Sequence, residues 1–190
     1  MLYGLRLLEE LVVSNTQIAL LYSQAAHIVA KQELDLVLPA RAPDAEKYFT
    51  DRFHAAPGQL RAYGREDWYS PIASGSNPSD AMVICPCTTG TLAAIAGGLS
   101  DNLIERAADV ALKERRQLIL VVRETPFSIL HLDNMLTLAR AGATIMPANP
   151  GFYNRPQTIE AIVDFIVARV LDHLAIPHTL TERWGRAAAG

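Results

Sequence analysis

The chain has 190 residues and a formal net charge of −3; half of its residues are hydrophobic and 19% are charged. This composition excludes a disordered chain, and the length suits one domain, residues 1–190, that buries about 70% of its unfolded surface without disulfides or metal. The charge balance gives no general attraction to nucleic acid or to an anionic membrane. No apolar run approaches the ~20 residues of a membrane span and no signal peptide opens the chain, so a cytoplasmic location is expected.

Helical and strand-like patterns alternate along the chain. An amphipathic helix is predicted over the opening MLYGLRLLEELVV, because its apolar residues recur at helical spacing. Apolar runs predict strands buried on both faces at 17–23, 81–87, 117–124 and 143–148. Helices are predicted at 25–33, 44–53, 88–102, 103–116, 128–142 and 158–174. The polar stretch from 54 to 80 is predicted to be irregular.

This alternation is typical of an α/β fold, a three-layer doubly wound parallel sheet of the Rossmann-like or flavodoxin-like kind. Ligands of such folds bind beyond the carboxyl ends of the strands. Candidate site residues are therefore sought directly after each predicted strand.

Two polar stretches follow predicted strands and precede helices. Ser23 is either an ordinary helix cap or a hydroxyl that faces a ligand. Thr88, Thr89, Gly90 and Thr91 form a turn whose hydroxyls, backbone N–H groups and positive helix end suit a phosphate, and a well-capped helix packed on the sheet is the alternative.

Charged residues end the next strand, where Arg123 can hold a phosphate or a polar flavin edge and Glu124 can act as an acid or base. The alternative is a salt bridge between the two. Cys85 and Cys87 lack the further ligands of a metal site and are expected to be buried, inert thiols. From the residues alone, the sequence predicts an α/β domain that binds a flat, phosphorylated ligand.

Five segments occur in an order and spacing that resemble one enzyme family. They are ASGS at 73–76, MVICPCTTGTLAAIA at 82–96, NLIERAADVALKERR at 102–116, LVVRETPFS at 120–128 and PANPGFYNRPQTIEAIVDF at 147–165. The resemblance is to the UbiX flavin prenyltransferases and covers essentially the whole chain. It implies transfer of a dimethylallyl group from dimethylallyl phosphate to N5 and C6 of reduced FMN, without a metal. It also implies a product used by UbiD-type decarboxylases and a homo-oligomer, commonly a dodecamer, with sites at subunit interfaces.

The resemblance also implies a role for each matching residue. Ser23, the turn Thr88–Thr91 and Arg123 would bind FMN, and Glu124 would be the acid or base. The residues expected around the prenyl donor are Lys113, Tyr153 and Arg169 for its phosphate, with Glu33, Arg106 and Trp184 at further active-site positions. Read without the resemblance, Lys113 and Arg169 are surface charges, Tyr153 packs a loop and Trp184 is an oligomer contact.

One feature of the family is missing from the sequence. Its members begin with a β-strand and a glycine-rich GASG loop ahead of the first helix, whereas this sequence begins at the helix. An interior strand that is absent leaves two unpaired sheet edges. The expectation is that the native protein begins upstream of Met1. The alternative is that the chain is a degenerate, weakly binding remnant. The alternative functions are a flavin-binding or assembly protein without turnover, and a related flavin-dependent cysteine decarboxylase.

Overall fold

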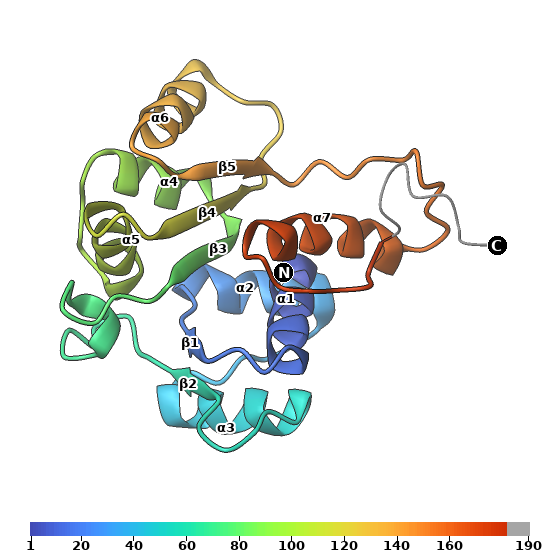
Figure 1. Ribbon diagram of the computed structural model, residues 1–190, viewed down its shortest axis with the longest axis horizontal. Helices are drawn as coiled ribbons and strands as arrows, with labels where there is room; N and C mark the ends of the chain where they lie inside the picture. Colours follow the sequence, from blue (N-terminus) through green and yellow to red (C-terminus); the bar gives the residue numbers. More distant parts are fainter. Residues whose placement is uncertain (182–190) are drawn as a thin grey trace.

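The computed structural model describes residues 1–181 and places two parallel sheets at the centre of the chain (Figure 1). In the smaller sheet β1 (Ile18–Leu20) pairs with β2 (Leu60–Ala62). In the larger sheet β4 (Gln117–Val122) lies between β3 (Ala81–Cys87) and β5 (Thr144–Pro147). All three pairings are parallel, which confirms the predicted α/β class. The short strand β2 lies in the stretch that was expected to be irregular, so that expectation was wrong there.

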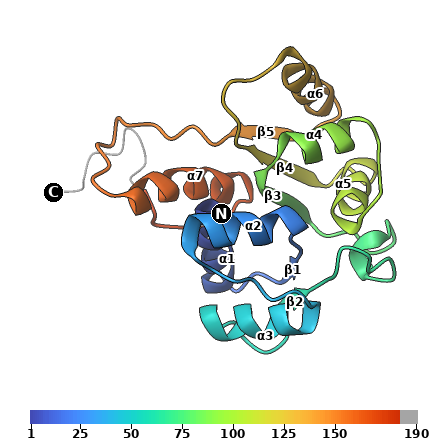
Figure 2. The ribbon, with the colours of Figure 1, turned by 180° about the vertical axis from the view of Figure 1, so that it is seen from behind.

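Helices connect and cover these strands. They are α1 (Leu2–Val13), α2 (Gln24–Leu34), α3 (Ala42–Phe53), α4 (Thr89–Ala96), α5 (Leu103–Lys113), α6 (Ile129–Arg140) and α7 (Ile159–His173), with a short 3-10 turn at Pro71–Ala73. Figures 1 and 2 show α4, α5 and α6 on one side of the larger sheet, with α1 and α7 on the other. Among residues 1–181, no helix has both the length and the apolar character needed to cross a membrane. That residues 1–190 form one domain stays a prediction.

The central strand β4 is buried on both faces, as predicted. Leu118 and Leu120 pack with α4, α5 and α6 in one core cluster, while Ile119 and Val121 pack with α1 and α7 in another. Each of these side chains is at most 1% exposed. The alternation of faces along one apolar strand explains why the sheet needs helices on both sides.

The helix predicted to end at Gly142 ends earlier, at Arg140. Gly142 follows the helix with a φ of +101°, a left-handed conformation that glycine adopts without steric cost. The residue therefore turns the chain from α6 into β5, two residues further on.

The two sheets are separate. β1 pairs only with β2 and β3 only with β4, so in the described part of the chain one edge of each strand has no strand partner. The expectation of two unpaired edges is confirmed. Helix α1 joins the two halves, because Leu7 belongs to the core beneath β4 whereas Leu8 and Val12 belong to the core around β1 and β2.

Helix α1 lies very close to β3. A Cβ atom added to Gly4 would collide with the backbone carbonyl oxygen of Cys85, so only glycine allows this approach. At the same helix, Arg6 donates from Nε to Oδ1 of Asp164 on α7 at 2.7 Å. These contacts hold α1 against the larger sheet.

Candidate functional site

A cavity of about 200 Å³ lies where three helices begin. It is lined by Ser23 before α2, Gly90 and Thr91 in the first turn of α4, Arg65 after β2, and Asn102, Ile104 and Glu105 at the start of α5. The starts of α2 and α4 follow the carboxyl ends of β1 and β3, the edge at which ligands of parallel α/β sheets bind. The structure thus brings Ser23 and the predicted turn together around one space.

The hydroxyl groups at this cavity cap the helices and leave the turn open. Ser23 Oγ accepts the Ala26 N–H at 3.2 Å, and Thr88 Oγ1 accepts the Thr91 N–H at 3.1 Å. A Cβ atom added to Gly90 would meet only Thr88 Oγ1, at 3.8 Å. First-turn N–H groups have no partner inside their own helix, so the starts of α2 and α4 can donate to an anion.

The start of α5 is already satisfied within the protein. Asn102 Oδ1 accepts the N–H groups of Ile104 and Glu105 at 3.1 and 3.3 Å, and its Nδ2 donates to Glu105 Oε1 at 2.7 Å. The other Glu105 oxygen accepts the Asp101 N–H at 2.9 Å. The Glu105 carboxylate is therefore held in the helix cap, and anion binding falls to the starts of α2 and α4.

Arg123 and Glu124 directly follow β4, next to the Thr88 turn. The Arg123 side chain is 56% exposed and its guanidinium lies 3.8 Å from a carboxylate oxygen of Glu33 on α2. The Arg123 N–H faces the carbonyl oxygen of Cys87, the residue before the turn, at 3.5 Å. Glu124 instead accepts the N–H of Thr125 at 3.1 Å. In residues 1–181 the carboxylate partner of Arg123 is thus Glu33 and not Glu124.

Helix α2 connects the cavity to this ion pair. Ser23 caps its first turn and Glu33 lies in its last turn. Ten residues at 1.5 Å per residue separate the two ends by about 15 Å. The candidate site is therefore elongated, with anion donors at one end and an accessible arginine at the other.

Two of the residues expected at the donor phosphate, Lys113 and Arg169, do not join this site within one chain. Lys113 ends α5 and pairs with Glu114 at 2.6 Å, on the side where β4 begins, whereas Arg123 follows the end of β4. Arg169 pairs with Asp172 at 2.7 Å in the last turn of α7, next to His173, whose carbonyl accepts from Gln117 at the start of β4. A single subunit therefore does not gather Lys113 and Arg169 around Glu124.

Tyr153 and Arg106 do not line the cavity either. Tyr153 lies in the segment after β5, which extends away from the sheet in Figures 1 and 2, and its ring packs edge-on against Phe165 at 5.7 Å. Arg106 donates to the Ala73 carbonyl at 2.9 Å and pairs with Asp109 at 2.7 Å. Trp184 lies outside the described residues.

The two cysteines lie in β3, beside the turn. Burial raises the pKa of Cys85 and of Cys87 to about 12, which keeps both as neutral thiols at physiological pH. The part of the chain that the structure describes has no group of three or more histidine, cysteine, aspartate or glutamate residues that could hold a metal ion. The raised pKa values agree with the interpretation of both cysteines as inert thiols; Cys87 is buried as expected, whereas Cys85 is partly exposed.

Sequence reasoning missed Arg65, Asn102 and Glu105. Arg65 follows β2, so recognition of that strand would have placed it at the ligand-binding edge by the same rule that found Ser23. Asn102 preceding an apolar helix is an N-cap signal that predicts the start of α5.

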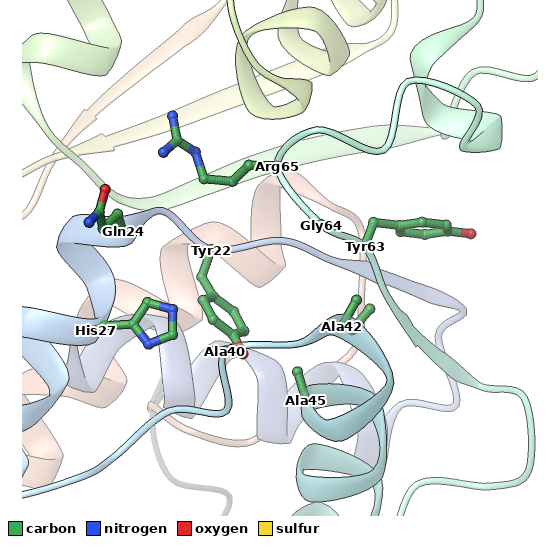
Figure 3. A pocket seen from close by; sticks show the side chains of 10 residues that line it. Tyr22, Gln24, His27, Ala40, Ala42, Ala45, Tyr63, Gly64 and Arg65 are labelled. Carbon is green, nitrogen blue, oxygen red and sulfur yellow. The ribbon is translucent and has the colours of Figure 1, made fainter.

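A second cavity of about 220 Å³ adjoins the first and shares Arg65 with it (Figure 3). Tyr22 and His27 form one side of it, with ring centroids 5.2 Å apart in an edge-on arrangement. The Tyr22 hydroxyl donates to the carbonyl of Pro39, and the small side chains of Ala40, Ala42 and Ala45 keep the space open.

Comparison with known proteins agrees with the fold. The family model named Flavoprotein matches residues 1–171. The chain is 55% identical over 183 residues to the flavin prenyltransferase UbiX of Pseudomonas aeruginosa, covering 96% of this chain and 88% of that protein. It is 45% identical over 184 residues to UbiX of Methanocaldococcus jannaschii, covering 97% and 92%.

Two solved structures are similar over nearly the whole chain. AnUbiX (PadA1), in complex with FMN and dimethylallyl pyrophosphate, gives a TM-score of 0.85 at 38% identity, covering 97% of this chain and 91% of that chain. A dodecameric FMN-dependent UbiX-like decarboxylase from Escherichia coli O157:H7 gives 0.84 at 38% identity, covering 97% and 92%.

Proposed function

Because the chain belongs to the UbiX flavin prenyltransferase family, we propose that it joins the dimethylallyl group of dimethylallyl phosphate to N5 and C6 of reduced FMN. The observation that carries the proposal is the cavity lined by Ser23 and the Gly90–Thr91 turn, with the accessible Arg123 directly after β4, the strand that pairs with β3. An elongated molecule with a phosphate at one end matches this arrangement. The product would serve a UbiD-type decarboxylase. The cytoplasmic location expected from the sequence stays a prediction.

The residues present fit FMN. The backbone N–H groups at the starts of α2 and α4 would hold the phosphate through charge-assisted hydrogen bonds. The hydroxyls of Ser23, Thr88, Thr89 and Thr91 would add to them. Arg123 would contact the polar edge of the flavin. The flavin ring supplies the nucleophilic atoms of the reaction. The pairing of Arg123 with Glu33 would hold the guanidinium at the end of α2 away from Ser23.

Transfer of the prenyl group breaks an allylic C–O bond and releases phosphate. Glu124 follows Arg123 and has an exposed carboxylate, so it would exchange a proton with the departing phosphate or the flavin. Lys113 and Arg169 would stabilise the phosphate dianion and Tyr153 would hydrogen-bond to it. With a phosphate leaving group neutralised by side chains, the proposed reaction needs no metal.

Lys113 and Arg169 lie near the start of β4, whereas Glu124 follows its end, so the proposal assigns these two residues to neighbouring subunits. Arg106 and Trp184 are proposed for the same shared site. An assembly is supported by apolar side chains exposed on α6, namely Ile129, Leu130, Leu132 and Leu136. We propose a homo-oligomer, and a dodecamer as its form.

The proposal is tested by incubating the purified chain with reduced FMN and dimethylallyl phosphate and measuring the mass of the flavin. A gain of one five-carbon unit is expected, and dimethylallyl pyrophosphate in a parallel reaction identifies the preferred leaving group. Glu124→Gln should lower the rate by about a hundredfold or more, since it removes the carboxyl group that exchanges the proton. Glu160→Gln, a matched change on the exposed first turn of α7, should not.

A second candidate is a flavin-binding or assembly protein without turnover. It is favoured by the separation of Lys113 and Arg169 from Glu124 within one chain. FMN that stays bound while its mass is unchanged would establish this function instead. Full activity in Glu124→Gln would remove that residue from the proposed catalysis.

A further inference from the structure

We propose that Arg65 is a further binding residue of this site, and that its guanidinium contacts the phosphate of FMN in the cavity where α2 and α4 begin. The inference rests on the proposed function, because it assigns the phosphate to this cavity. It concerns a residue that the motifs of the sequence did not single out.

The backbone of Arg65 is fixed at the edge of the cavity. Its carbonyl oxygen accepts the N–H of Leu103, the first residue of α5, at 2.7 Å. Figure 3 shows the Arg65 side chain extending toward Gln24 at the start of α2, whereas the ring of Tyr63 points the opposite way. Arg65 lines both cavities, so its side chain lies between them.

The Arg65 guanidinium has no partner among the described residues. Its side chain forms no ion pair or hydrogen bond within residues 1–181, and its Nε is buried without a partner. Arg6, Arg106, Arg123 and Arg169, by contrast, each pair with a carboxylate. A buried N–H without a partner is uncommon in native proteins and indicates a missing acceptor.

The surroundings select an anion as that acceptor. Glu105 is the one carboxylate that lines the same cavity, and both of its oxygens are occupied in the α5 cap. The hydroxyls of Ser23 and Thr91 and the positive starts of two helices face the same space. A guanidinium binds phosphate through two parallel N–H bonds, which matches a phosphate held from the other side by backbone N–H groups.

Paired flavins test the contact. The full chain and Arg65→Gln are titrated with FMN and with riboflavin, which lacks the phosphate, and the two dissociation constants are compared. Arg65→Gln should weaken FMN binding about ten- to a hundredfold, the size of a lost charge-assisted hydrogen bond, and leave riboflavin binding unchanged. Arg61→Gln, the same change at an exposed position on β2, should alter neither. Arg65→Lys should recover part of the loss, because it keeps the charge without the bidentate geometry.

The outcomes separate this inference from the proposed function. Wild-type chain that binds FMN, with Arg65→Gln binding it equally well, overturns the role of Arg65 and leaves flavin binding intact. Equal weakening of FMN and riboflavin also overturns it, because a phosphate contact cannot affect riboflavin. Failure of the wild-type chain to bind FMN overturns the proposed function and this contact together. Circular dichroism of each variant identifies a loss of binding that comes from misfolding.

Discussion

The central strand of the larger sheet is buried more completely than β1 of the smaller sheet. In the larger sheet β4 is enclosed on both faces, and its side chains from Leu118 to Val122 are at most 1% exposed. In the smaller sheet β1 has three residues, and Ile18, Ala19 and Leu20 all keep some exposure. Hydrophobic stabilisation follows the area removed from water, so β4 contributes more to the folding free energy than β1. The cavity of the candidate site lies between the two halves, where neither core fills the space.

The largest expected difference between the halves comes from truncating one leucine in each. Leu120→Ala in β4 should lower the free energy of unfolding by about 3 kcal/mol, because it leaves a cavity in a closed core. Leu20→Ala in β1 should cost about 1 kcal/mol, since that side chain is only partly buried. Urea denaturation of both variants measures the two values. Equal losses of unfolding free energy in the two variants would contradict the greater contribution of β4 than of β1.

Gly4 tests the junction between the halves. Gly4→Ala should destabilise the chain by about 2 kcal/mol, because the added methyl group meets the Cys85 carbonyl and forces α1 away from β3. Gly64→Ala is the control, as a Cβ atom there has no neighbour within 4 Å, and it should change stability by at most about 0.5 kcal/mol. Thermal melts followed by circular dichroism distinguish the two. A neutral Gly4→Ala would show that α1 does not depend on this close approach.

Removing the N-cap of α5 tests how the larger half shapes the cavity. Asn102→Ala should cost about 1–2 kcal/mol, since it removes two hydrogen bonds to the first turn of α5 and frees Glu105. The freed carboxylate would then repel an anion in the cavity, so FMN affinity should fall in the same variant. Isothermal titration and chemical denaturation measure the two effects. Asn154→Ala, an exposed position in the segment after β5, should leave both unchanged.

The smallest expected effect is the reaction of the two cysteines at alkaline pH. With the pKa of Cys85 and Cys87 raised to about 12, iodoacetamide at pH 9 should label almost none of the folded chain. In an unfolded chain the thiol pKa is about 8.5, so the stability from the neutral thiols is complete below that pH and declines as the pH rises toward 12. Mass spectrometry counts the labels with and without guanidinium chloride. Labelling of the folded chain at pH 9 would show that the larger half opens at β3.

Pattern alone predicted the larger half better than the smaller one. Strands β3, β4 and β5 follow from uninterrupted apolar runs, because a strand buried on both faces needs no polar residue. Strand β2 carries Arg61 between two apolar residues and is three residues long, so it gives no run to detect. The loss of β2 from the prediction also removed Arg65 from the candidate site. Tertiary pairing, and not local preference, makes that segment a strand.

The same contrast applies to the site. Ser23 and the Thr88–Thr91 turn were predicted because parallel strands deliver their following residues to one edge, a rule that holds within a chain. The expected roles of Lys113 and Arg169 came from resemblance, and no rule of local sequence places them beside Glu124. Their positions near the opposite end of β4 follow from α5 and α7 running back along the sheet.

The rigidity of α2 has a consequence for which molecules can occupy the site. A single α-helix fixes the separation between its two ends, so the cavity at Ser23 and the ion pair at Glu33 cannot approach each other without unwinding it. A ligand that contacts both ends at once must therefore span about 15 Å, a length set by the ten residues between Ser23 and Glu33.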